Sequence, residues 1–515
     1  PARDCPEVQA AHSEKLDETD KAVVAEIVHD ATKACADRLA DEGHNLSAYN
    51  TTQNAADVNA VRRALGYDQV NLYGGSYGSL LAQAVMRDHP ENIRSVVLTS
   101  VLPLEKSLFV DASATTAQAI LRLLDTCAAD DACNAAYPDL QSKLYEVIDR
   151  LNADPVPVTD TNPLDGDSYD ALLTGETVRA NLVTFLYTTQ IIPVLPQAID
   201  DVYEGDYELM TQLSSTRLAL LDLLSRGMTF SVVCAEDLIG RTPDDLLAVI
   251  ASMPSQLVVG TELETIVEHG IYGICADWPV TETDPAVKEP LVSDIPTLVL
   301  AGELDPVTPP EYGELVAEYL SKGYFYEVPG VGHNIIIEEC ARLLAGAFLA
   351  VPSQAPDAAC IADMPGVVFD LPTEAPELVL EPFSDETRGF NGLVPVGWDE
   401  LAPANLARKT TALDPTYFVL EGTPGTAAEL FGNLAGQLGL DPEMASDSQA
   451  QVGNFVWDFY TFERRGNMAD IALAEDDEKA YFVFLVSTPE EHDALFEQLF
   501  LPAVEAMAPV PVESE

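Results

Sequence analysis

The chain has 515 residues, more than one hydrophobic core usually accommodates, so we expect two or three domains. Apolar residues make up 47% and charged residues 22%, a composition that excludes wholesale disorder. The 85 acidic residues against 26 basic ones give a net charge of −59, which excludes nucleic acids and anionic membranes as partners. Adaptation to high salt is an alternative explanation of this charge.

The first hundred residues alternate helices with strands. Helical spacing recurs before residue 66, with Asn54 as the expected N-cap of the second helix. A strand, a sharp turn, a helix and a second strand then follow in the pattern of a parallel α/β unit. The predicted elements are helices over 21–39 and 55–65, a strand over 69–73, a turn over 74–78, a helix over 79–89 and a strand over 93–100.

Residues 105–285 are dominated by helical patterns, after which the α/β pattern returns. The returning elements are an apolar strand over 295–302, a helix over 311–322 and a strand over 324–328. We therefore predict a doubly wound, mostly parallel sheet with a helical cap inserted between two of its strands. The predicted α/β core consists of 1–104 and 286–369, with 105–285 as the cap.

The chain changes character after the second part of the core. A Pro- and acid-rich stretch predicts a linker at 370–387. The remainder, 388–515, reads as antiparallel strands and a helix, and so as a small α+β domain. That helix is expected to begin with a capping box formed by Thr488 and Glu491 around Pro489. We find no catalytic constellation in this domain, and its role stays open.

The turn GGSYG carries the chemistry. Gly74, Gly75 and Gly78 allow a strained strand-to-helix turn that raises the Ser76 hydroxyl at the carboxyl end of the sheet. The backbone N–H of Tyr77, at the start of the helix, is then placed to stabilise an oxyanion. An isolated G-x-S-x-G pattern also fits an ordinary glycine turn, but its place between a strand and a helix favours a nucleophile.

A serine nucleophile needs a base and an orienting acid. Of seven histidines only His333 follows a sheet strand, in the loop VPGVGHN. Asp305, in the loop after strand 295–302, is the expected acid, and Glu303 is its competitor. The other histidines precede the turn or lie on its helix, in the cap or in the last domain: His12, His29, His44, His89, His269 and His492.

The eight cysteines form no C-x-x-C pair, so we expect no metal site and no cofactor. Neighbours along the chain suggest four local disulfides, although eight cysteines allow about 105 pairings. Bridges would favour an exported protein, secreted or in the cell envelope, whereas free thiols would fit the cytosol. The suggested pairs are Cys5–Cys35, Cys127–Cys133, Cys234–Cys275 and Cys340–Cys360.

Over roughly residues 1–365 the chain resembles the tripeptidyl-aminopeptidase and proline-iminopeptidase-like α/β-hydrolases. The resemblance rests on NLYGGSYG, RDHPENIRSVVLTSVLP, CAED, IPTLVLAGELDPVTPP and VPGVGHN. It implies that acidic residues of the cap bind the free amino terminus of a substrate. By that likeness Glu236 in CAED is the amine anchor, with Asp237 as second candidate and Trp278 lining the same pocket. A surface acid beside a cystine is the alternative for both carboxylates.

The chain departs from this family before Ser76. Family members have several strands there, and a loop of HGGP type gives the second oxyanion donor. Here the 75 preceding residues are mostly helical, and PARDCPEV resembles the segment that follows those strands. We therefore expect a chain without the N-terminal portion of the family, an exposed sheet edge and an incomplete oxyanion hole. Removal of a signal segment, truncation or processing would each give the Pro1 start.

Three functions fit these residues. The first is a serine exopeptidase that cuts short peptides from a free amino terminus through an acyl-enzyme. The second is an esterase on small acyl esters, which would use the same triad. The third is a catalytically impaired hydrolase retained as a binding or surface module. No run of 18 apolar residues occurs, so no integral membrane segment is expected, and the oligomeric state stays open.

Overall fold

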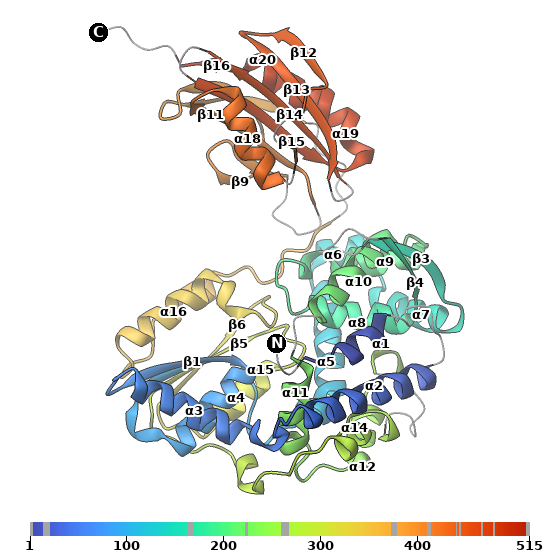
Figure 1. Cartoon of the computed structure of the whole chain (residues 1–515), viewed down its shortest axis with the longest axis vertical. Helices are drawn as coiled ribbons and strands as arrows, with labels where there is room; N and C mark the ends of the chain where they lie inside the picture. Colours follow the sequence, from blue (N-terminus) through green and yellow to red (C-terminus); the bar gives the residue numbers. More distant parts are fainter. Residues whose placement is uncertain are drawn as a thin grey trace. The chain divides into compact units, whose positions relative to one another are not determined.

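The computed structural model divides the chain into two compact units, Pro1–Leu371 and Pro372–Glu515 (Figure 1). None of the helices described is both long and apolar enough to cross a lipid bilayer. The residues that the structure describes are 4–13, 21–161, 168–221, 225–258, 267–371, 378–408, 414–438, 440–441, 444–464, 467–476 and 479–510.

The first unit is built on a four-stranded parallel sheet in the order β1-β2-β5-β6. Its strands are β1 (Val70–Ser76), β2 (Ile93–Val101), β5 (Thr297–Gly302) and β6 (Gly323–Val328). β2 pairs with β5 although the predicted cap separates them in the chain. The predicted parallel α/β sheet is confirmed. Within the described residues β1 has a paired neighbour on one side only.

Helices cover both faces of this sheet (Figure 1). Alternation along β5 explains the two layers, because successive side chains of a strand point to opposite faces. Leu298 and Leu300 pack in the cluster under one helix, whereas Val299 packs in the cluster under three others. α16 (Glu339–Ala350) covers the first face, and α3 (Thr51–Ala64), α4 (Tyr77–Asp88) and α15 (Pro310–Glu318) cover the second.

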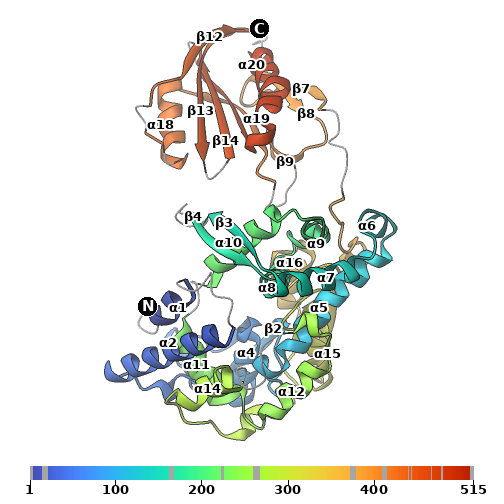
Figure 2. The same cartoon turned by 90° about the vertical axis from the view of Figure 1, so that its right-hand side faces the viewer.

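Residues 105–285, the predicted cap, are mainly helical, but they also hold a two-stranded hairpin that the sequence did not reveal (Figure 2). Its strands are β3 (Val156–Thr161) and β4 (Ser168–Leu173). The cap helices are α5 (Leu108–Ala129), α6 (Asp131–Ala136), α7 (Leu140–Ala153), α8 (Gly175–Phe185), α9 (Leu195–Glu204), α10 (Glu208–Leu221), α11 (Arg226–Val232), α12 (Pro243–Ala251) and α14 (Ile271–Asp277). The remaining helices of this unit are α1 (Pro6–Ser13), α2 (Lys21–Asp41) and α17 (Ala359–Ala362).

The expected start of α3 was wrong by one helical turn. The helix begins at Thr51, and the side chain of Asn50, not Asn54, caps it by accepting a hydrogen bond from the Gln53 amide. Asn54 lies in the first turn and donates instead to the Tyr77 hydroxyl at 2.9 Å. Two asparagines one turn apart satisfy the same local pattern, and the contact with Tyr77 is a tertiary one.

The four predicted disulfides are confirmed: Cys5–Cys35, Cys127–Cys133, Cys234–Cys275 and Cys340–Cys360. No free cysteine remains. Such a complement of bridges is typical of proteins from oxidising compartments. Cys234 and Cys275 join the segment after α11 to α14 across 41 residues.

Removing the Cys234–Cys275 bridge should destabilise the first unit by about 4 kcal/mol, since a long closed loop restricts the unfolded chain most. The double substitution Cys234→Ser and Cys275→Ser is the test, measured by urea unfolding. The matched control removes Cys127–Cys133, whose separation of 6 residues predicts a smaller loss of about 2 kcal/mol. Eight free thiols in protein isolated from its native compartment would contradict the bridges altogether.

The second unit is α+β. A seven-stranded antiparallel sheet has the order β12-β13-β14-β15-β11-β10-β9, and a three-stranded sheet has the order β16-β8-β7. Its strands are β7 (Leu380–Asp385), β8 (Phe390–Pro395), β9 (Asp399–Ala402), β10 (Asn405–Ala407), β11 (Tyr417–Pro424), β12 (Ser448–Val452), β13 (Phe455–Arg464), β14 (Asn467–Glu475), β15 (Lys479–Ser487) and β16 (Ala508–Pro509). Its helices are α18 (Ala427–Leu438), α19 (Pro489–Leu495) and α20 (Leu501–Ala506).

Two local expectations for this region need correction. The predicted linker 370–387 contains β7, which pairs with β8, so the second unit begins earlier than residue 388. Pro382 and the acidic residues of β7 resemble a linker in sequence, but β7 is an edge strand, whose outer side needs no hydrogen-bonded partner and tolerates a proline. α19 begins after Thr488 as expected, but the Thr488 side chain caps no backbone amide, and Glu491 binds Arg408 at 2.6 Å.

Candidate active site

Ser76 occupies a strained turn between β1 and α4. Its φ of 53° and ψ of −128° lie in a region that residues with a side chain rarely adopt. A Cβ at Gly74 would overlap the Gly78 carbonyl oxygen, and one at Gly75 would lie 2.8 Å from Thr99 Oγ1. Gly74 and Gly75 are therefore required sterically, whereas a Cβ at Gly78 would meet nothing within 4 Å.

Tyr77 opens α4, so its backbone N–H is one of the helix's unpaired initial donors. Its side chain points away from the turn: the hydroxyl contacts Thr51 Oγ1 at 3.0 Å and accepts from Asn54 at 2.9 Å. Burial raises the pKa of the Tyr77 hydroxyl, although the hydrogen bonds from Thr51 and Asn54 oppose the shift. The ring therefore anchors the start of α4 to the start of α3.

The structure brings His333 and Asp305 together. His333 Nδ1 lies 2.8 Å from Asp305 Oδ2 and 3.0 Å from Oδ1, and the Asp305 side chain is fully buried. The amides of Val307 and Thr308 donate to Asp305 Oδ1, and the Thr308 hydroxyl donates to Oδ2 at 2.7 Å. Each carboxylate oxygen thus has a fixed donor besides the imidazole, which orients the pair.

Glu303, the competing acid, has another partner. Its Oε2 accepts a hydrogen bond from the Gly330 amide at 2.7 Å. This contact joins the loop after β5 to the loop after β6, upstream of His333. Glu303 therefore stabilises the backbone of the loop after β6. Of the two carboxylates, only Asp305 bonds the imidazole.

Ser76 ends β1, and Asp305 and His333 follow β5 and β6 of the same parallel sheet. All three thus lie at the carboxyl edge, where such folds bind ligands. No described hydrogen bond joins the Ser76 hydroxyl to the His333 ring. Within the described residues no group of three or more His, Cys, Asp or Glu side chains is arranged to hold a metal ion.

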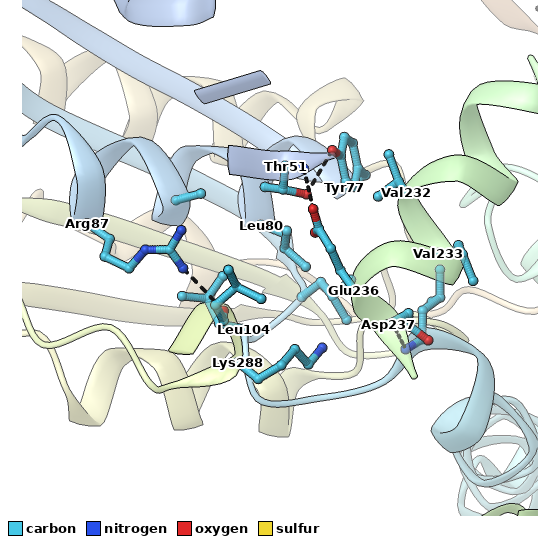
Figure 3. Close-up of a pocket in the computed structure, with 14 residues that line it drawn as sticks. Thr51, Tyr77, Leu80, Arg87, Leu104, Val232, Val233, Glu236, Asp237 and Lys288 are labelled. Carbon is cyan, nitrogen blue, oxygen red and sulfur yellow. Dashed lines mark hydrogen bonds between the residues drawn. The ribbon is translucent and has the colours of Figure 1, made fainter. Parts of the chain in front are cut away.

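Glu236 faces a small cavity of about 50 Å³ beside Tyr77 and α4 (Figure 3). Its Oε1 accepts a hydrogen bond from the Thr51 amide, and the Thr51 side chain also bonds the carboxylate. Burial raises the pKa of Glu236, and the Thr51 hydrogen bonds and the charges of Lys288 and Arg87 oppose the shift. The cavity has room for a few water molecules or a polar head group.

Asp237 has a different environment, although it lines the same cavity. Its carboxylate accepts from the Ser107 hydroxyl at 2.6 Å and from the amides of Leu108 and Phe109 at 2.9 and 3.1 Å. These amides are the first donors of α5, so Asp237 stabilises the helix N-terminus. Burial lowers the pKa of Lys288, and the negative charges of Asp237 and Glu236 partly offset this shift by raising the pKa.

Trp278 is not among the residues lining this cavity. It is 3% exposed, packs in a core cluster with Phe230, and donates from its indole N–H to Ser231 Oγ at 3.1 Å. Sequence reasoning missed three residues around His333: Thr308, Ser100 and Tyr187. Only Thr308 had a local signal, since a threonine three residues after an aspartate often closes a side-chain turn.

The fold is that of an α/β hydrolase. Residues 31–339 match the model of the alpha/beta hydrolase fold family, and the chain belongs to that family. It is also similar to serine protease Hip1 of Mycobacterium tuberculosis and of Mycobacterium bovis, at 27% identity over 345 residues. The match covers 60% of this chain, and the chain spans 61% of the length of those relatives.

Solved structures of low sequence identity are also similar to this chain. A thermophilic esterase from Thermogutta terrifontis is 15% identical, with a TM-score of 0.25. The match covers 59% of this chain and 74% of the esterase chain. MGS-M2, an alpha/beta hydrolase enzyme from a Medee basin deep-sea metagenome library, is 16% identical, with a TM-score of 0.25. The match covers 63% of this chain and 76% of the MGS-M2 chain.

Proposed function

We propose that the protein is a serine hydrolase in which Ser76 is the nucleophile, His333 the base and Asp305 the orienting acid. The observation that carries this proposal is the buried Asp305–His333 pair at the same sheet edge as the strained turn of Ser76. A backbone strain of about 1–3 kcal/mol persists where the surrounding structure enforces it, and such positions cluster at active sites. Family membership supports hydrolysis as the reaction class.

In this proposal His333 removes the proton of the Ser76 hydroxyl while Oγ attacks the substrate carbonyl. The tetrahedral oxyanion accepts a hydrogen bond from the Tyr77 amide. His333 then gives its proton to the leaving amine or alcohol, and an acyl-enzyme remains. Water attacks that ester, again with His333 as base, and releases the acid and the free serine.

For the substrate we propose short peptides with a free amino terminus, in keeping with the resemblance to tripeptidyl-aminopeptidases and proline iminopeptidases. Glu236 is the favoured anchor because Thr51 is the one residue described as bonding its carboxylate, and the adjoining cavity has room for a head group. Asp237 is disfavoured because its carboxylate already accepts hydrogen bonds from Ser107 and from the first amides of α5. Trp278, buried elsewhere, supports the core.

Glu236→Gln should lower kcat/KM for peptides with a free amino terminus by about 100-fold, because it removes one partner of a partly buried ion pair. Acetylated peptides and simple esters should change little, since they carry no ammonium group. As the pKa of Glu236 is raised, acidification should protonate it and erode the preference at a higher pH than for an ordinary glutamate.

Asp237→Asn is the matched control for this experiment. It should destabilise the start of α5 and lower the melting temperature. It should also reduce kcat/KM for both substrate classes to the same extent. Equal losses on both classes in Glu236→Gln would make Glu236 structural. If the wild-type protein hydrolyses esters and ignores peptides with a free amine, the esterase replaces the exopeptidase as the function.

We further propose an extracytoplasmic location, secreted or in the cell envelope, which the four disulfides support. In this proposal the α/β core is formed by 1–104 and 286–369, and 105–285 covers it as a cap. The second unit carries no part of the triad.

A further inference from the structure

The backbone of His333 is held from the core side by Ser100. The Ser100 hydroxyl donates a hydrogen bond of 2.5 Å to the His333 carbonyl oxygen. Ser100 is an extra residue in β2: Gly75 pairs with Thr99 and Ser76 pairs with Val101, so Ser100 forms a bulge opposite the nucleophile. One residue therefore adjoins the Ser76 strand and bonds to the backbone of the base.

Ser100 has a strained backbone conformation that a glycine at this position would adopt without strain. Its φ is 49°, a left-handed value that glycine adopts without cost and serine does not. Ser100 is only 2% exposed, so solubility does not explain a serine here. The hydrogen bond to His333 is what a glycine at this position would lose.

The same loop is held from the cap side by the turn Leu186–Thr189, which follows α8. The Asn334 amide donates to the Tyr187 carbonyl at 3.2 Å, and the Gly332 amide donates to Thr189 Oγ1 at 3.3 Å. A Cβ at Gly332 would overlap the Leu186 carbonyl oxygen. The two backbones thus lie in direct contact immediately before and after His333.

The ring of Tyr187 completes this contact. Its centroid lies 4.7 Å from that of the His333 imidazole, with the planes inclined by 57°. Rings at this distance and tilt attract each other beyond the area they bury. Tyr187 is 37% exposed, so only part of its ring packs in the core.

We propose that Ser100 and the turn Leu186–Thr189 form a two-sided clamp that positions His333 for proton transfer, so that a seated cap is a condition for catalysis. The inference rests on the proposed serine hydrolase function. Ser100 and Tyr187 are positioning residues in this clamp, because they act through His333. A base displaced by about 1 Å can cost about 100-fold in rate, so loosening either side should lower kcat.

The core side is tested with Ser100→Ala and Ser100→Gly. Both remove the hydroxyl, but only glycine relieves the strain at φ 49°. We expect both to lower kcat and the rate of fluorophosphonate labelling about 10- to 100-fold with KM unchanged, although Ser100→Gly should melt at the higher temperature. Ser95→Ala is the control: Ser95 is another buried serine of β2, bonded to Asn71 far from the site, and labelling should keep the wild-type rate.

The cap side is tested with Tyr187→Ala, which should lower kcat and labelling to a similar extent. Tyr187→Phe keeps the ring over His333 and should restore most of the rate. The control is Tyr319→Ala, since Tyr319 is 38% exposed and follows α15 outside the loop contacts. A small fluorophosphonate is the probe for both sides, because it reports on the serine and its base with few cap contacts.

The outcomes separate this inference from the function on which it rests. If the wild-type protein is not labelled at Ser76, the proposed function fails. If the wild type is labelled and neither Ser100→Ala nor Tyr187→Ala slows it, the clamp is wrong and the function stands. A loss confined to one side contradicts a two-sided clamp. Rates that follow melting temperature, with Ser100→Gly faster than Ser100→Ala, would make Ser100 purely structural.

Discussion

Replacing Ser76 with alanine should lower kcat by about a million-fold on any substrate the protein hydrolyses, without unfolding it. Alanine keeps the Cβ, so the backbone cost at φ 53° is the same in both proteins and stability should barely change. The measurement is turnover together with thermal unfolding. His333→Ala should cost nearly as much, since nucleophile and base act as one unit.

The result that would remove Ser76 from the site is turnover comparable to that of the wild-type protein. A serine elsewhere would then be the nucleophile. The fluorophosphonate adduct, located by peptide mapping, identifies it directly. Ser79→Ala is unsuitable as a control for Ser76→Ala. The Ser79 hydroxyl accepts a hydrogen bond from the Leu102 amide and donates one to the Ser76 carbonyl oxygen, so its loss would disturb the turn of Ser76.

The parallel sheet could be predicted from sequence because its signals are local. β1 and β5 are short apolar runs flanked by turn residues, and periodicity and length identify such strands. The hairpin of β3 and β4 was missed since its strands carry polar and acidic residues and lie within a helical segment. β7 was missed because an edge strand tolerates prolines.

The site was only partly predictable, for a related reason. Ser76 was predicted from a contiguous motif and His333 by elimination, and both predictions use chain order alone. The sequence could not show that Asp237 has hydrogen-bond donors that Glu236 lacks. One of these donors is the amide of Leu108, which is 129 residues away in the chain. Ser100 and Tyr187 carry no motif; they gain their roles only when β2 and the cap meet the loop of His333.

Asp305→Asn should lower kcat by about 10,000-fold with the fold intact. The amides of Val307 and Thr308 both donate to Oδ1, so the carbonyl oxygen of an asparagine would take that place. Its NH2 group would then face His333 Nδ1, where Oδ2 now accepts at 2.8 Å. Nδ1 would have to become an acceptor, which puts the proton on Nε2 and removes the base that Ser76 needs.

The pH at which this variant is assayed should not rescue it, because the fault is the tautomer and the lost negative charge. Glu303→Gln is the matched control: it removes the charge of the neighbouring acid but keeps an oxygen for the Gly330 amide. It should cost less than about 10-fold, the scale of one ordinary hydrogen bond. If Glu303→Gln were instead the more damaging change, Glu303 would be the orienting acid, and the buried Asp305–His333 contact would only stabilise the loop.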